Sequence, residues 1–406
     1  MALKTSCASL SRAGSAASAS ASTSRLLQLC VGYFGAYTLT GVLVKWFTVV
    51  RDPKLPEMTY LFNNTIGGSV LALGLVIVLG WVKLKSNRLV RWGPFQVPSE
   101  VAYIIPSGVC TAIVIPTTTL MYSLPISVLV AMVIMRGSII VISRLVDEVQ
   151  LRQGILKKRV YGDENWAVLF ALLAVATNVL LVPVVDALEA RGVALGRALG
   201  INSGAGKGSF EFLHSPAAMA ILGSYIVAYA FRLYIMNYFK NTRAPGVPQD
   251  NQGFFAIEQI AASVSMVLIG VFFFYAPGML GWGAKPVLAW HEAVHQPHFT
   301  AFLSGLPYGV VAFFSVFIFM FKGRTATFAG LVNRLTSLVA GTTATVLCAL
   351  LFRLNFPKAQ DWASLGLILV AVWFLSRAEQ KRVAELRGSA QARSVARAAP
   401  VPAAGG

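Results

Sequence analysis

The fold of this chain is decided by residues 325–352, which read TATFAGLVNRLTSLVAGTTATVLCALLF. A helix needs about 20 apolar residues to cross the ~30 Å hydrocarbon core of a membrane, and this stretch is longer. Arg334 lies near its middle. A guanidinium keeps its proton in hydrocarbon, where its burial costs about 2.5 to 3.5 kcal/mol on insertion scales. An arginine at this depth must therefore face the protein interior.

A second stretch of the same kind covers residues 125–146 and carries Arg136. Counted from the N-terminal edge of each stretch, Arg136 and Arg334 lie at nearly the same depth. This pairing predicts a duplicated architecture with a polar, anion-binding cavity at its centre.

The composition is that of an integral membrane protein. Hydrophobic residues make up 56% of the 406 positions and charged residues 12%, whereas a soluble domain carries about 25% charged residues. Hydropathy predicts an all-α fold with ten transmembrane helices, at residues 27–50, 60–82, 101–122, 125–146, 166–187, 216–239, 254–279, 299–321, 325–352 and 362–376.

The lysines and arginines outside these spans predict the orientation of the chain. With a cytoplasmic N-terminus, 22 of the 34 basic residues fall on the cytoplasmic side and 8 on the other. Basic residues gather on the cytoplasmic side of membrane proteins, so both termini are predicted to be cytoplasmic. The net charge of +18 then reflects topology and adhesion to anionic lipid. No nucleic-acid partner is expected.

The ten spans divide into two five-helix repeats, residues 27–187 and 215–376, joined by an extramembrane loop at 188–214. Residues 64–70 (NTIGGSV) align with residues 258–264 (EQIAASV), and Pro106 and Pro307 precede the two arginines at similar distances. Because five is odd, the repeats must lie in opposite orientations, as in many transporters. Residues 1–26 and 377–406 are predicted to be cytoplasmic tails; disorder is favoured for the first, and a targeting segment is the alternative.

Few ionisable residues lie within the spans, and most of them are basic. Lys45 and Arg232 are close enough to span ends to reach an interface, whereas Arg136 and Arg334 are not. Guanidinium groups bind carboxylates and phosphates bidentately, so these two are the predicted substrate anchors. A purely structural role is the alternative. Glu258, an acidic residue in the seventh span, is predicted either to pair with an anchor or to carry a coupled proton.

Further residues are predicted to hydrogen-bond the polar parts of the substrate: Asn333, Asn64, Thr65 and Gln259. Four tyrosines either line the cavity or belong to the core: Tyr33, Tyr37, Tyr225 and Tyr229. The four cysteines have no CxxC spacing, and the histidines at 291, 295 and 298 have no acidic or cysteine partner pattern. No metal and no cofactor is therefore predicted.

These features resemble the drug/metabolite transporter superfamily, including its EamA-like and nucleotide-sugar transporter branches. Val44-Lys45-Trp46 is similar to the lysine near the end of that family's first span. Gly330-Leu331-Val332-Asn333-Arg334 resembles the Gly-Ala-Leu-Asn-Lys motif of the ninth span in nucleotide-sugar transporters. Leu61-Phe62-Asn63-Asn64 is similar to the Phe-Tyr-Asn-Asn motif of GDP-mannose carriers, although that motif belongs to their seventh span and here lies in the second. The resemblance implies a ten-span inverted-repeat transporter.

The expected function is therefore secondary transport of a small polar, anionic metabolite by alternating access, in the nucleotide-sugar or phosphorylated-metabolite class. A lipid flippase on the same scaffold is one alternative. A membrane-embedded enzyme acting on a lipid or polyprenyl phosphate is another, but it would need catalytic acids or a nucleophile dyad that the spans lack. The expected partners are the substrate, the bilayer and, as an option, a second copy of the chain. A bacterial inner membrane is favoured over an organelle membrane.

Overall fold

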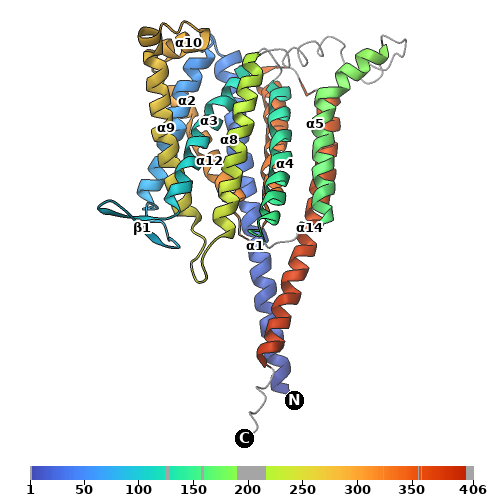
Figure 1. The fold of residues 1–406 in the computed structure, drawn as a ribbon. Coiled ribbons are helices and arrows are strands. Elements are labelled where there is room, and N and C mark those ends of the chain that lie inside the picture. Colours follow the sequence, from blue (N-terminus) through green and yellow to red (C-terminus); the bar gives the residue numbers. More distant parts are fainter. Residues whose placement is uncertain are drawn as a thin grey trace.

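In a computed structural model the protein is a helical bundle with one small hairpin (Figure 1). The structure describes residues 2–123, 128–156, 160–189, 216–322, 324–354, 356–357 and 359–398. Its first half contains α1 Ala2–Lys45, the π-helical turn η1 Trp46–Val50, α2 Glu57–Val78, β1 Leu89–Trp92, β2 Phe95–Pro98, α3 Val101–Ser123, α4 Val128–Arg152 and α5 Gly162–Glu189. Its second half contains α8 Pro216–Asn241, α9 Asn251–Leu280, α10 Lys285–Val294, α11 Phe299–Ser304, α12 Leu306–Phe319, α13 Ala326–Phe352 and α14 Ala359–Ala398.

The predicted class, a multi-pass helical membrane protein, is confirmed. Within the described residues, eight helical segments are long and apolar enough to span a membrane: Ser24–Val50, Glu57–Val78, Val101–Thr118, Ala218–Asn241, Asn251–Leu280, Phe299–Phe319, Ala326–Phe352 and Trp362–Glu385. The predicted spans at 125–146 and 166–187 coincide with α4 and α5, which are not among the eight. In α4, Arg144, Asp147 and Glu148 add charge to the second half of the helix.

The first and last helices extend beyond the bundle at the same end of the molecule (Figure 1). α1 begins at Ala2, so residues 2–26 are helical here, where the sequence favoured a disordered tail. Alanine, frequent in this segment, has the highest helix propensity of all residues. α14 likewise continues to Ala398, through most of the predicted C-terminal tail. The predicted loop at 188–214 lies outside the described residues except for its first two positions.

Two helix crossings bring backbones into close contact. Between α2 and the α11–α12 joint, a Cβ on Gly305 would overlap the backbone oxygen of Asn64 and lie 2.8 Å from the nitrogen of Gly68. Between α3 and α9, a Cβ on Gly108 would lie 2.7 Å from the backbone oxygen of Glu258. Small residues permit such approach where no hydrophobic drive exists between helices in lipid. The two glycines therefore set the spacing of these helix pairs.

Charged contacts tie several helices together at the end of the bundle where the chain begins. Asp147 of α4 is fully buried and accepts hydrogen bonds from the backbone nitrogens of Ala326 (2.8 Å) and Thr327 (2.6 Å) at the start of α13. Glu164 of α5 pairs with Arg382 of α14 at 2.5 Å. A carboxylate at a helix N-terminus accepts hydrogen bonds from the free N–H groups there and interacts favourably with the positive end of the helix dipole. These contacts hold α4, α5, α13 and α14 together at this end.

The β1–β2 hairpin leads from α2 into α3 and is fastened at its base by Glu100. The Glu100 carboxylate accepts hydrogen bonds from the backbone nitrogen of Asn87 (2.6 Å) and from the hydroxyl of Ser86 (2.5 Å), and it pairs with Arg243 at 3.0 Å. Burial of the carboxyl group favours its neutral form, but these hydrogen bonds and Arg243 outweigh that effect and lower the pKa of Glu100. The hairpin is thereby anchored to the segment after α8.

The Gly305 crossing can be tested with one methyl group. Gly305→Ala should lower the thermal denaturation midpoint of the purified protein by several degrees, because the added Cβ forces α2 and α12 apart. Gly366→Ala in α14 is the matched control, since a Cβ there meets nothing within 4 Å. The control should be neutral or stabilising, because alanine is favoured over glycine in a helix by about 1 kcal/mol. Equal midpoints for the two variants would contradict the close approach.

Candidate functional site

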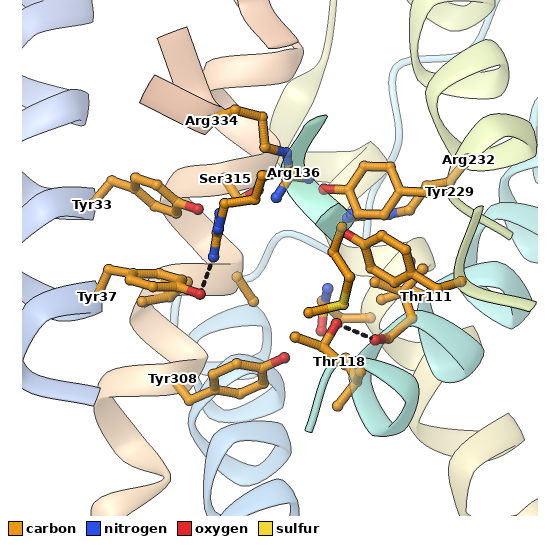
Figure 2. Close-up of a pocket in the computed structure, with 17 residues that line it drawn as sticks. Tyr33, Tyr37, Thr111, Thr118, Arg136, Tyr229, Arg232, Tyr308, Ser315 and Arg334 are labelled. Carbon is orange, nitrogen blue, oxygen red and sulfur yellow. Dashed lines mark hydrogen bonds between the residues drawn. The ribbon is translucent and has the colours of Figure 1, made fainter. Parts of the chain in front are cut away.

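A cavity of about 80 Å³ lies at the centre of the bundle, where helices from both halves of the chain meet (Figure 2). Its walls come from α1, α3, α4, α8, α9, α12 and α13. Five tyrosines, three arginines and one glutamine dominate its polar surface. The lining residues are Tyr33, Tyr37, Thr111, Val114, Ile115, Thr118, Met135, Arg136, Tyr225, Tyr229, Arg232, Gln259, Tyr308, Val311, Ala312, Ser315 and Arg334.

Arg136 reaches from α4 towards two tyrosines of α1. Its guanidinium lies over the ring of Tyr37, with 4.7 Å between Cζ and the ring centroid, and it donates hydrogen bonds to the hydroxyls of Tyr37 and Ser337. Tyr33 and Tyr37 are four residues apart on α1, so they share one helix face, and their ring centroids are 5.6 Å apart. Figure 2 shows Arg136 extended beside these two rings.

Arg334 makes a corresponding contact from α13 to α8. Its Cζ lies 4.6 Å from the ring centroid of Tyr229 and 5.8 Å from that of Phe319. Tyr225 and Tyr229 are again four residues apart, with ring centroids at 5.4 Å. An arginine over an aromatic face is stabilised by ~0.5 to 2 kcal/mol or more as it is desolvated. The tyrosine pairs therefore offset part of the cost of burying two guanidinium groups.

Two buried side chains of the cavity have donors without a hydrogen-bond partner in the described part of the chain. Arg334 is 5% exposed, yet its Nε and Nη2 have no hydrogen-bond partner among the described residues. The same holds for Nε2 of Gln259, which is 3% exposed and lines the same cavity. Buried donors are satisfied in most native structures, by protein or by bound solvent and ligands. An acceptor seated in the cavity would satisfy both side chains.

The third arginine of the cavity has a carboxylate partner. Nε and Nη2 of Arg232 donate to the two oxygens of Glu258 at 2.9 and 3.1 Å. Hydroxyls of Ser107 (2.6 Å) and Thr111 (3.3 Å) donate to the same carboxylate. The sequence suggested that Glu258 pairs with Arg136 or Arg334, and that Arg232 reaches an interface. The structure instead buries Arg232, because α8 turns its side chain towards α9.

The charges around the cavity therefore do not cancel. Arg136, Arg232 and Arg334 contribute three positive charges, and Glu258 beside them contributes one negative charge. None of the lining residues is an aspartate or a glutamate. Excess positive charge in a site of low dielectric strongly favours an anion over a neutral or cationic ligand. An anionic ligand would therefore fit the charge of this cavity.

The structure brings some of the predicted site residues together and separates others. Arg136, Arg334 and Gln259 line the cavity. Asn333 lies just behind the wall, where it accepts a hydrogen bond from Tyr33 at 3.4 Å and donates one to Ser315 at 3.1 Å.

Two predicted residues lie elsewhere. Asn64 donates to the hydroxyls of Tyr60 (3.1 Å) and Ser304 (3.2 Å) in the packing between α2 and α11, and it does not line this cavity. Thr65 lines a separate, apolar cavity. Tyr308, Thr111 and Thr118 line the central cavity without having been singled out from the sequence.

No protein-family model matches the chain, and no curated protein matches it.

The Arg232–Glu258 pair predicts a non-additive effect on stability. Glu258→Gln leaves Arg232 buried without a counter-charge, and should lower the free energy of unfolding by about 3–5 kcal/mol. The double variant Arg232→Met/Glu258→Met removes both charges and should recover most of that loss. Thermal denaturation of the purified variants measures both effects.

The control for this experiment is Glu148→Gln. Glu148 pairs with Arg152 at 3.1 Å on the protein surface, where an ion pair contributes less than about 1 kcal/mol. Its denaturation midpoint should match that of the parent protein. A double variant that is less stable than Glu258→Gln would show that the two buried side chains do not act as a pair.

Proposed function

We propose that this protein is a secondary membrane transporter, not an enzyme, and that it moves a small anionic metabolite by alternating access. Its scaffold would be two five-helix repeats in opposite orientation, of the drug/metabolite transporter type. The observation that carries the proposal is a pair of matching arginine–tyrosine contacts, one from each half of the chain, that face one cavity with excess positive charge.

The pattern of helix contacts supports the two-repeat scaffold. In a five-plus-five repeat, α1, α2, α3, α4 and α5 correspond to α8, α9, α11–α12, α13 and α14. Each contact between two helices then requires a counterpart between the corresponding helices, so α1 against α12 implies α8 against α3, and α1 against α13 implies α8 against α4. These pairs pack together, as do α2 with α12 and its counterpart α9 with α3. The contacts α4–α13 and α5–α14 are their own counterparts, as expected on a twofold axis.

The same correspondence holds at the level of residues in the cavity. Arg136 over Tyr37 joins α4 to α1, and Arg334 over Tyr229 joins α13 to α8, at 4.7 and 4.6 Å. Each contacted tyrosine is the second of a pair spaced by four residues. Two unrelated helix pairs have no reason to reproduce this arrangement, whereas an inverted repeat does.

A Ser-Gly step repeats in the close crossings as well. Ser304-Gly305 contacts α2 at Asn64, and Ser107-Gly108 contacts α9 at Glu258. Asn64 and Glu258 are the residues that the alignment of residues 64–70 with 258–264 places opposite each other. This agreement between sequence alignment and packing gives independent support to the repeat.

The size of the cavity narrows the class of substrate. At ~10–15 Å³ for each water-sized position, about 80 Å³ has room for roughly five to eight non-hydrogen atoms. A phosphate-sized oxyanion or a short carboxylate is of this size. Pockets for drug-sized ligands are about 300–1,000 Å³, so a nucleotide sugar would require the helices to separate. We therefore favour a small phosphorylated or carboxylated metabolite.

Proton coupling through Glu258 stays a prediction. If Glu258 releases and takes up a proton in the transport cycle, Glu258→Gln should abolish pH-driven accumulation and keep counterflow exchange. Unchanged accumulation would exclude this role.

Replacement of Arg334 tests anion binding. Arg334→Lys should weaken binding although it keeps the charge, because an ammonium cannot reproduce the planar, bidentate fork. Arg334→Ala should lose about 2–5 kcal/mol of binding free energy if the contact is desolvated. Stabilisation of the purified protein against heat by inorganic phosphate, phosphorylated C3 metabolites and short dicarboxylates measures this, because a ligand stabilises the state it binds.

Two control variants accompany this series. Arg91→Ala removes an exposed arginine from the hairpin and should leave binding unchanged. Tyr229→Phe keeps the aromatic face under Arg334 and should also retain most of the affinity. If Arg334→Ala bound the anions as well as the parent but melted far lower, Arg334 would be structural and the proposal would fail.

The inverted repeat also predicts a topology. Reporter fusions after Leu151 and Ala390 should be cytoplasmic, and a fusion after Ala205 should be on the opposite side, because five crossings separate the N-terminus from residue 205. A cytoplasmic signal at residue 205 would contradict the scaffold.

A further inference from the structure

A second cavity, of about 340 Å³, lies apart from the anion site and has opposite chemistry. It is enclosed by α2, α3, α8 and α9, with α10 at one side. Its walls are almost wholly apolar, as Leu61 of α2, Ile113 of α3 and Phe273 of α9 illustrate. Of the side chains that the structure describes, none that lines this cavity is charged.

The second cavity offers few hydrogen-bond partners to a water molecule. Among the described residues, hydroxyls are contributed only by Thr65, Thr117 and Ser224. The Thr117 hydroxyl is already used, because it donates to the backbone oxygen of Ile113 at 2.6 Å. A buried water needs two to four polar partners, and an apolar cavity of about 150 Å³ can stay dry and take up apolar molecules. The matching occupant is therefore a hydrocarbon.

The position of the second cavity gives that hydrocarbon a route of entry. The cavity lies among helices that span the membrane, and Ile269 and Ser224 on its walls are exposed at the outer surface of the bundle. Trp290 of α10 closes one side, with its indole N–H donating to the backbone oxygen of Gly270 at 3.0 Å and its ring against Phe62 at 5.5 Å. The molecules that surround such an opening in a bilayer are lipid acyl chains.

We propose that the second cavity is a binding site for one acyl chain of a membrane phospholipid. A chain bound at this site would also affect the anion cavity, because α3 forms the wall between the two cavities. Val114, Ile115 and Thr118 face the anion cavity, whereas Pro116 and other residues of the same turns face the second cavity. Pro116 cannot donate the hydrogen bond that would hold this turn of α3, so packing from a bound chain supports the helix where it is weakest. The site does not depend on the proposed function.

Photolabelling of the full-length protein tests this site. The protein is reconstituted into vesicles that contain a phosphatidylcholine with a diazirine near the end of one acyl chain, then irradiated, and the labelled residues are mapped by mass spectrometry. Met266 and Phe273 in the cavity should be labelled several-fold more than Val267 and Leu268, which lie on the exposed face of the same helix. A bound chain resides at the cavity residues, whereas bulk lipid exchanges rapidly on the exposed face.

Variants separate a specific site from general contact with lipid. Ala112→Phe fills the cavity from α3, and Ser224→Phe blocks its rim. Because Ser224 is exposed, the Ser224→Phe variant should fold. Both should reduce cavity labelling several-fold. Val109→Phe, on the exposed face of α3, should not. The proposal is overturned if Met266 and Phe273 are labelled no more than Val267 and Leu268, if Ser224→Phe leaves their labelling unchanged, or if a photoreactive sterol labels them and the acyl chain does not.

Discussion

Positive charge that cannot be neutralised inside a membrane is the constraint on which the centre of this bundle depends. A guanidinium does not lose its proton, so burial must be offset by contacts that the surrounding helices supply. Arg232 is offset by Glu258, with two hydroxyls added to the carboxylate. Arg136 and Arg334 lie instead over tyrosine rings, which attract a cation without adding a negative charge. Aromatic rings therefore leave the net charge of the cavity positive. Carboxylates in their place would have cancelled that charge and removed the attraction for an anion.

The close helix crossings let this arrangement exist in lipid. Arg136 and Arg334 contact tyrosines on neighbouring helices, and these contacts hold only if the helices around them exclude hydrocarbon from the centre. Gly305 and Gly108 allow α2 to approach the α11–α12 joint and α9 to approach α3 at backbone distance. Since α12 also packs on α1 and α3 on α8, each crossing supports the helix that carries a tyrosine pair. Packing and charge compensation are therefore linked in both halves of the chain.

Sequence predicted the membrane class and the burial of Arg136 and Arg334 in the protein interior, because hydropathy, length and residue type are read directly from the chain. It did not predict which way each helix turns. Asn64 and Thr65 belong to a span at the right depth, but the rotation of α2 directs Asn64 to Ser304 and Thr65 to the apolar cavity. Arg232 lies close enough to a span end to reach an interface, and only the packing of α8 on α3, beside α9, pairs it with Glu258. The spacing of four residues between Tyr33 and Tyr37, and again between Tyr225 and Tyr229, was a usable signal, since it places an aromatic pair on one face of each of two helices.

The two halves differ in one respect that bears on how such a scaffold would move. Under the proposed correspondence, Glu258 takes the place of Asn64, and Arg232, three residues after Tyr229, takes the place of Thr40, three residues after Tyr37. Around Glu258, an ion pair and two hydroxyls therefore join α8, α9 and α3. Around Asn64, the hydrogen bonds to Tyr60 and Ser304 are neutral, and the Thr40 hydroxyl donates within its own helix, to the backbone oxygen of Ala36 at 2.9 Å. Separation of buried charges costs more than separation of neutral groups. If the protein alternates between two openings, α3, α8 and α9 would then move together as one rigid group, and the weaker contacts of α1, α2 and α12 would be those that change.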